Sequence, residues 1–144
     1  MKNTKVFYVT SPIFYPNAKP HIGHAYTTLL CDVLTRRHRF LSGDETYFLT
    51  GTDEHTEKVV QAARAQGQTP ENYLEEIVAR FKELYTRLGI KYDQFIRTSD
   101  QTVHWPGAIE MWNRLMNAGD LYKASYTCLY CIGCEAFKTE KDLI

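Results

Sequence analysis

The sequence has no excess of charge of either sign. Its 144 residues carry 17 basic and 17 acidic side chains, so the formal net charge is zero. Broad electrostatic binding of nucleic acid needs a basic surface, and this balance argues against such binding by the segment alone. Contact with one end of an RNA stays open.

Long apolar runs, internal repeats and low-complexity segments are absent as well. No run of about 18 apolar residues exists, so we expect no membrane span. Residues 1–5 lack the apolar core of a signal peptide, and we expect a cytoplasmic protein. The apolar share of 44%, with 13% aromatic residues, is enough for the core of one domain, or of one domain with a small appendage.

Cysteine is scarce, and three of the four cysteines lie close together. Cys31 stands alone in a predicted helix, whereas Cys128, Cys131 and Cys134 are clustered. Without secretory features, such a cluster indicates metal binding rather than disulfides. Cys131 and Cys134 form a Cys-x-x-Cys pair, which is half of a zinc knuckle, and Cys128 offers a third ligand. Because no histidine follows, the site is incomplete in this chain, completed elsewhere, or not a metal site.

Strands and helices alternate along most of the chain. The patterns predict a buried strand over 5–10, a helix from 25 to about 41, and a second buried strand over 46–50. In this order they form a βαβ unit with parallel strands. Further helices are predicted over 56–65, 70–88 and 102–118, with a third strand over 92–97. We therefore predict an α/β fold with a Rossmann-like parallel sheet and flanking helices.

Two of the predicted helices carry apolar stripes that we interpret as core-facing. These stripes comprise Tyr73, Ile77, Phe81, Leu84 and Leu88 in one helix, and Trp105, Ile109, Trp112 and Met116 in the other. The pattern changes after Gly119, where a strand-like stretch at 121–127 leads into the cysteine cluster. We place a domain boundary near residue 118, which separates 1–118 from a small part at 119–144.

The sequence Pro-His-Ile-Gly-His at 20–24 lies where a loop leads into the first predicted helix. A helix N-terminus offers unpaired N–H groups and a partial positive charge. His21 and His24 are three residues apart, so they share one face of the first turn. Gly23 has no side chain, so a ligand can approach the backbone closely. These features suit a phosphate chain, and we interpret the junction as a nucleotide triphosphate site.

A second polar segment, Gly-Thr-Asp-Glu-His at 51–55, follows the second predicted strand. The carboxyl ends of neighbouring parallel strands open on the same edge of a sheet. We therefore expect Asp53 and His55 to face the same cleft as His21 and His24. Two alternatives to phosphate binding are a zinc site made by these four side chains, or histidines with a purely structural role.

Several segments together resemble the methionyl-tRNA synthetases, a family of class I aminoacyl-tRNA synthetases. They are Thr-Ser-Pro-Ile-Phe-Tyr-Pro-Asn at 10–17, Lys-Pro-His-Ile-Gly-His at 19–24, Leu-Thr-Gly-Thr-Asp-Glu-His at 49–55, Leu-Tyr-Lys at 121–123 and the cysteine segment at 129–137. The resemblance covers essentially the whole chain. It implies ATP-dependent activation of methionine to methionyl-adenylate, with Mg²⁺, followed by transfer to the acceptor end of tRNA.

The resemblance also implies roles for individual residues. His21 and His24 would bind the ATP phosphates and stabilise charge while the methionine carboxylate attacks the α-phosphorus. Further ATP contacts would come from Thr10, Asn17, Lys19 and Gly23, and methionine contacts from Ile13, Tyr15 and Asp53. Cys131 and Cys134 would bind structural Zn²⁺ at the start of a zinc-knuckle insertion, with Cys128 as a further candidate.

Parts of the family pattern are missing from the sequence. It contains no Lys-Met-Ser-Lys-Ser loop, no second half of the nucleotide-binding fold and no helical domain that reads the anticodon. We expect the N-terminal part of a longer enzyme, which alone is inactive or nearly so. Two alternatives stay open. One is a small nucleotidyltransferase of the His-x-Gly-His superfamily, and the other is a non-catalytic fragment with residual ligand binding or zinc-dependent docking.

Overall fold

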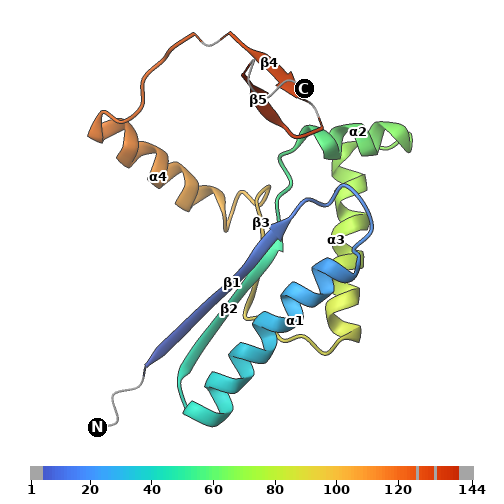
Figure 1. Cartoon of the computed structure of the whole chain (residues 1–144), viewed down its shortest axis with the longest axis vertical. Helices are drawn as coiled ribbons and strands as arrows, with labels where there is room; N and C mark the ends of the chain where they lie inside the picture. The colour runs from blue at the N-terminus through green and yellow to red at the C-terminus, as the bar shows by residue number, and fades with distance from the viewer. Residues whose placement is uncertain (1–4, 126, 132, 140–144) are drawn as a thin grey trace. The chain divides into compact units, whose positions relative to one another are not determined.

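The computed structural model describes residues 5–125, 127–131 and 133–139 (Figure 1). These residues divide into two compact units, one ending at Trp105 and the other beginning at Pro106. The division assigns helix α4 (Trp105–Ala118) to the second unit. It therefore lies earlier than the boundary that we expected near residue 118, and that boundary stays a prediction about the domains of the protein.

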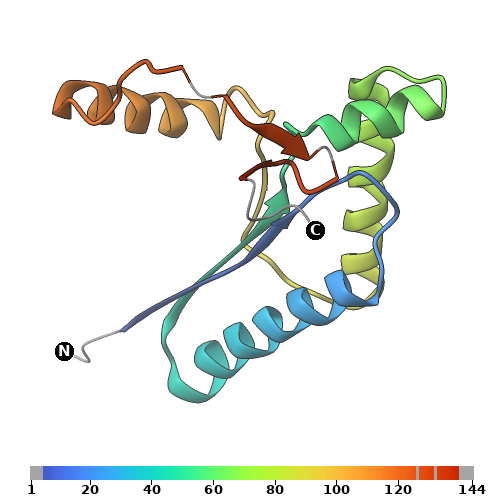
Figure 2. The ribbon, with the colours of Figure 1, turned by 45° about the horizontal axis from the view of Figure 1, so that its top comes forward.

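The first unit contains a parallel sheet, described here with the strand order β1-β2-β3. Its strands are β1 (Val6–Phe14), β2 (Glu45–Thr52) and β3 (Gln94–Arg97). Both pairings are parallel, and α1 (Ile22–Arg37) connects β1 to β2. In Figures 1 and 2, α1 runs alongside these two strands. The predicted parallel βαβ unit is confirmed.

Strand β1 is longer than the sequence indicated. We expected it to end at Thr10, but it continues to Phe14 after a register shift between Thr10 and Ile13. Pro12 has no N–H group to donate to a ladder, which fits its place at this irregularity. The Ser11 hydroxyl lies 2.7 Å from the Thr50 hydroxyl on β2, and this contact holds the two strands together across the shift.

The helices of the first unit begin and end near the predicted positions. A π-helical turn over His38–Ser42 extends α1. Helix α2 spans Glu57–Ala65, and α3 spans Pro70–Arg87. The Thr69 hydroxyl caps α3 by accepting from the Asn72 N–H. Gly89 follows the end of α3 with a φ of 67°, which a residue with a side chain rarely adopts.

The core lies between the sheet and helices α1, α2 and α3. It includes Phe48 on β2, Val59 on α2, and Tyr73, Phe81 and Tyr85 on α3, all of which are fully buried. Most of the predicted α3 stripe is therefore confirmed as core. The exception is Leu88, whose side chain is 42% exposed beyond the end of the helix.

The second unit contains α4 and an antiparallel pair, β4 (Leu129–Cys131) with β5 (Ala136–Lys138). The prediction that α4 has a core-facing stripe is wrong for this structure, because α4 as described has no buried residue. Ile109, Trp112 and Met116 are each more than half exposed. An apolar period predicts that a helix face can be covered, but not which layer covers it. The strand-like stretch expected at 121–127 forms no strand at its described positions.

No helix in the described part of the chain is both long and apolar enough to cross a membrane.

Candidate active site

The N-terminus of α1 is capped by the two histidines. The Gly23 N–H donates to Nδ1 of His21, and the His21 N–H donates to Nδ1 of His24, each over 3.1 Å. This reciprocal pair is a capping box in which imidazoles replace the usual hydroxyl and carboxylate. The two rings stack with their centroids 3.8 Å apart. Because each Nδ1 accepts a hydrogen bond, each neutral ring has its proton on Nε2, where it can be donated to a ligand.

His24 packs against aromatic side chains of the core. Its ring meets Phe14 edge-on at 4.6 Å and lies 5.2 Å from Phe81. Burial, together with the neighbouring His21, lowers the pKa of His24 below its usual value. At neutral pH His24 is therefore a neutral hydrogen-bond donor rather than a fixed cation.

Gly23 is required by the fold of the cap itself. A Cβ at this position would lie 2.9 Å from Cε1 of His21 and 3.1 Å from its Nδ1. The His21 ring thus occupies the space in which a side chain would stand. The absence of a side chain at Gly23 therefore leaves space for the His21 ring, as well as for a ligand.

The predicted methionine contacts meet at the carboxyl ends of β1 and β2. The Asp53 N–H donates to the Phe14 carbonyl over 2.9 Å, which places Asp53 beside the residues that flank Phe14. Those residues, Ile13 and Tyr15, are 41% and 43% exposed. Asp53 is half-buried, and among the described residues its carboxylate forms no hydrogen bond or ion pair. An apolar-aromatic wall and an unpartnered carboxylate therefore share one sheet edge.

The other predicted ATP contacts lie on the surface around this edge. Thr10 is on β1 opposite Leu49, and the Asn17 carbonyl accepts from the Tyr73 hydroxyl over 2.8 Å. Asn17 and Lys19 line a cavity of about 580 Å³ together with Arg80 of α3. Their roles in ATP binding stay predictions.

His55 lies apart from the two cap histidines. Its ring centroid is 6.4 Å from that of Trp105, and it lines a cavity of about 650 Å³ that neither His21 nor His24 lines. The structure does not support the prediction that His55 faces the same cleft as His21 and His24. Within the described ranges, no group of three or more His, Cys, Asp or Glu side chains could hold a metal ion. The alternative zinc site at His21, His24, Asp53 and His55 is therefore wrong.

The cysteine pair of the second unit has one feature of a metal-binding knuckle. The Cys134 N–H donates to Sγ of Cys131 over 3.4 Å. Backbone and side-chain hydrogen bonds from Cys134 lower the pKa of Cys131, which favours the thiolate that a metal needs. These two residues fit half of a zinc site. Cys128 does not join them in a three-ligand group among the described residues, so Zn²⁺ binding stays a prediction.

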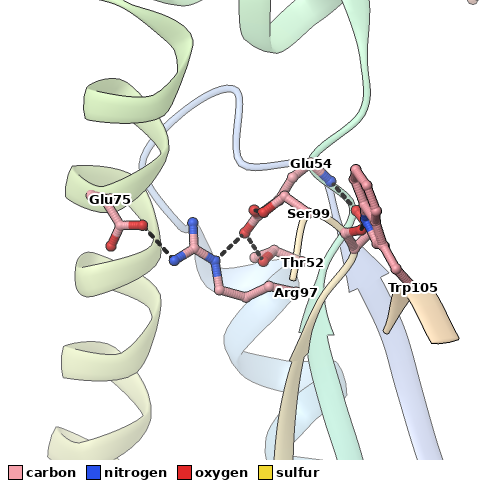
Figure 3. A network of polar contacts seen from close by, with 7 residues as sticks. Thr52, Glu54, Glu75, Arg97, Ser99 and Trp105 are labelled. Atoms are coloured by element: carbon pink, nitrogen blue, oxygen red, sulfur yellow. Dashed lines mark hydrogen bonds and ion pairs between the residues drawn. The ribbon is translucent and has the colours of Figure 1, made fainter. Parts of the chain in front are cut away.

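The sequence analysis missed a buried polar network beside Asp53 (Figure 3). The Glu54 side chain is fully buried, and one oxygen accepts from the Thr52 hydroxyl over 2.7 Å and from Nε of Arg97 over 2.8 Å. Its other oxygen accepts from the Ser99 hydroxyl. Burial alone would raise the pKa of Glu54, but the hydrogen bonds from Arg97, Ser99 and Thr52 lower it further than burial raises it.

A signal for this network was present in the sequence. Residues 52–54 end the second strand and 97–99 end the third, and parallel neighbouring strands bring such ends together. Arg97 also bridges to Glu75 of α3, so the network connects β2, β3 and α3.

Comparison with known proteins identifies the family. The family model described as tRNA synthetases class I (M) matches residues 7–144. The chain belongs to this family. Among curated relatives of this synthetase chain, the methionine–tRNA ligase of Clostridium perfringens is 46% identical over 140 residues, which are 97% of the chain and 21% of that protein. The methionine–tRNA ligase of Thermotoga maritima is 44% identical over 96% of the chain and 22% of that protein.

A solved structure of the same family shares the fold. It is Mycobacterium tuberculosis methionyl-tRNA synthetase in complex with methionyl-adenylate, with a TM-score of 0.90 and 40% identity. The match covers 96% of the synthetase chain and 27% of that protein. The predicted family and the predicted Rossmann-like parallel sheet with flanking helices are confirmed. The chain spans about a fifth of the length of the curated relatives it matches.

Proposed function

We propose that the chain is the N-terminal part of the catalytic domain of a methionine–tRNA ligase. The complete enzyme would activate methionine with ATP and transfer it to the acceptor end of tRNA. The observation that carries the proposal is the histidine cap of α1, which supports phosphate binding at the same sheet edge as the Asp53 carboxylate. The relatives named above support methionine as the amino acid.

The chemistry divides between two sets of groups. The methionine carboxylate oxygen attacks the α-phosphorus, a new P–O bond forms, and the bond to pyrophosphate breaks. The Nε2–H groups of His21 and His24 donate to phosphate oxygens and stabilise the charge that develops there. Asp53 accepts the methionine ammonium through a charge-assisted hydrogen bond, and this holds the carboxylate in line for attack. Ile13 and Tyr15 border the methionine side chain.

Two metal ions accompany the proposal. Mg²⁺ would neutralise the ATP phosphates. The first turn of α1 has no acidic residue, so we expect phosphate oxygens and water to hold the ion there. Cys131 and Cys134 would hold structural Zn²⁺ with ligands supplied by residues outside the described cluster. Cytoplasmic localisation stays the prediction made from the sequence.

The proposal includes a limit on activity. A chain that spans about a fifth of its relatives and has no Lys-Met-Ser-Lys-Ser loop would provide only part of the site. We therefore expect these 144 residues alone to be inactive or nearly so.

Methionine-dependent exchange of pyrophosphate into ATP tests the proposal, measured on the complete protein that contains this chain. We expect exchange with methionine, and a loss of about 10²-fold or more in His21→Ala and His24→Ala, since each removes a transition-state donor. Exchange that responds to a phosphopantetheine-type acceptor instead of methionine would support the small nucleotidyltransferase. No exchange in a folded complete protein would support the non-catalytic alternative.

A further inference from the structure

The geometry points to Thr98 and Glu54 as positioning residues for Asp53. This inference rests on the proposed function, in which Asp53 holds the substrate ammonium. Neither residue would touch the substrate. Together they fix the peptide groups on both sides of Asp53, so that its carboxylate is presented to the ligand in one orientation.

Asp53 is bounded by hydrogen bonds in two directions. Its own N–H donates to the Phe14 carbonyl of β1 over 2.9 Å. The preceding carbonyl, of Thr52, accepts from the Thr98 N–H over 3.2 Å, and the following N–H, of Glu54, donates to the Thr98 hydroxyl over 2.8 Å. The backbone of Asp53 is thus tied to β1 on one side and to Thr98 on the other.

Thr98 contributes to both peptide groups that flank Asp53. The ladder between β2 and β3 ends at the pair Thr52 and Arg97. One residue further along, the Thr98 side chain takes the place of a backbone acceptor, and it is 8% exposed. A buried N–H without an acceptor is costly, so this hydroxyl determines where the Glu54 N–H points.

The neighbouring carboxylates Asp53 and Glu54 have different environments. Glu54 is fully buried, and Thr52, Arg97 and Ser99 donate to both its oxygens (Figure 3). It has no free oxygen to offer a substrate ammonium. Asp53 is half-buried and unpartnered among the described residues, so it is the one available to a ligand. The buried Glu54 carboxylate holds the segment in place, and the adjacent Asp53 carboxylate is left available to bind a ligand.

Loss of this anchor should act on recognition of the ammonium. A displacement of about 1 Å in a positioning group can reduce activity by about 10²-fold. Thr98→Val keeps the shape of the side chain but removes the acceptor of the Glu54 N–H. We expect the KM for methionine to rise about tenfold or more while the KM for ATP is unchanged, because the histidine cap lies on α1.

The experiment uses the complete protein and two competitive inhibitors. Methioninol keeps the ammonium and lacks the carboxylate, whereas 4-(methylsulfanyl)butanoate keeps the carboxylate and lacks the ammonium. Thr98→Val should weaken inhibition by methioninol by the same factor as it raises the KM for methionine. It should leave inhibition by 4-(methylsulfanyl)butanoate unchanged. Thr98→Ser keeps the hydroxyl and should restore wild-type values. Glu54→Gln is the second variant, with the same direction of effect, in case Thr98→Val does not fold.

Thr35→Val is the matched control, because Thr35 is also buried but its hydroxyl donates to the Cys31 carbonyl within α1. It should leave all the kinetic constants unchanged. The inference is overturned if Thr98→Val and Glu54→Gln leave the KM for methionine unaltered. It is also overturned if inhibition by both compounds is weakened to the same extent. A wild-type protein without methionine-dependent exchange refutes the proposed function, and the inference fails with it. An active wild type with unaffected variants refutes the inference alone.

Discussion

Replacing Gly23 by alanine tests whether the histidine cap positions the His21 imidazole for its proposed role at the ATP phosphates. The new Cβ would stand 2.9 Å from Cε1 of His21, and an ordinary van der Waals contact begins at 3.4 Å. The ring must therefore move by about 0.5 Å, and the alanine side chain has no rotation that avoids it. The displaced ring would lengthen or lose its bond to the residue-23 N–H and its stacking on His24.

The effect on the reaction should exceed the effect on the fold. A lost neutral hydrogen bond costs about 1 kcal/mol of stability, and alanine recovers up to about 1 kcal/mol of helix propensity, so the two roughly cancel. A misplaced transition-state donor costs about 10²-fold in rate. We therefore expect Gly23→Ala to reduce kcat for ATP–pyrophosphate exchange by about 10²-fold with little change in Tm.

The matched control is Gly107→Ala in α4, where a Cβ would meet no atom within 4 Å. Exchange kinetics and thermal unfolding of both variants, measured on the complete protein, check the argument. Gly107→Ala should keep full exchange activity and a Tm equal to or above that of the wild type. A Gly23→Ala enzyme with wild-type kcat would refute the view that the ring needs this space.

Three further predictions concern the fold and the proposed zinc site. Gly51→Ala places a Cβ 2.0 Å from the Ile96 carbonyl, so β2 and β3 must separate, and circular dichroism should show loss of folded protein. Arg97→Met leaves the Glu54 carboxylate buried without its cation and should cost about 3 kcal/mol at pH 7 in urea unfolding. The native Glu54 pKa is lowered, so the stabilisation from the charged carboxylate is lost as pH falls through that pKa. The loss of unfolding free energy in Arg97→Met should therefore be smaller in acid than at pH 7. An equal loss in acid and at pH 7 would contradict this. Cys131→Ser should abolish bound zinc in elemental analysis, whereas Cys31→Ser, which changes a buried cysteine remote in sequence, should not.

Local signals in the sequence predicted the helices and strands of the first unit. Thr69 with Pro70 marks the start of α3, and Gly89 marks its end, because helix termini depend on a few adjacent residues. The strand-end positions of Asp53 and of the junction before α1 followed from the βαβ order alone. These features need no knowledge of what packs against them.

Features that depend on packing were harder to predict. On α1 the buried residues include Thr28, Asp32 and Thr35, whereas Leu30 and Val33 are 47% and 52% exposed. Asp32 can be buried because Arg36, four residues further along the helix, and the Lys91 N–H donate to it, and the Lys91 partner is too remote in sequence to be visible as a pattern. The apolar stripe of α4 was wrongly predicted to be buried for the same reason, since the sequence does not show what packs against that helix. Periodicity locates an apolar face but does not identify the layer that covers it.

His24 places a hydrogen-bond donor, rather than a fixed positive charge, at the N-terminus of α1. The His24 pKa is lowered in the free protein by burial and by His21, so under the proposed function the cap would attract phosphate at neutral pH through oriented N–H groups and the helix dipole. Protonation of His24 would place a proton on Nδ1, which accepts the His21 N–H, and would break the cap. Under the proposed function, binding of ATP should therefore take up no proton at His24 near neutral pH, and calorimetry in buffers of different ionisation enthalpy would measure this. In this way the proposed site would hold a polyanion without a permanent basic patch, in a chain of zero net charge.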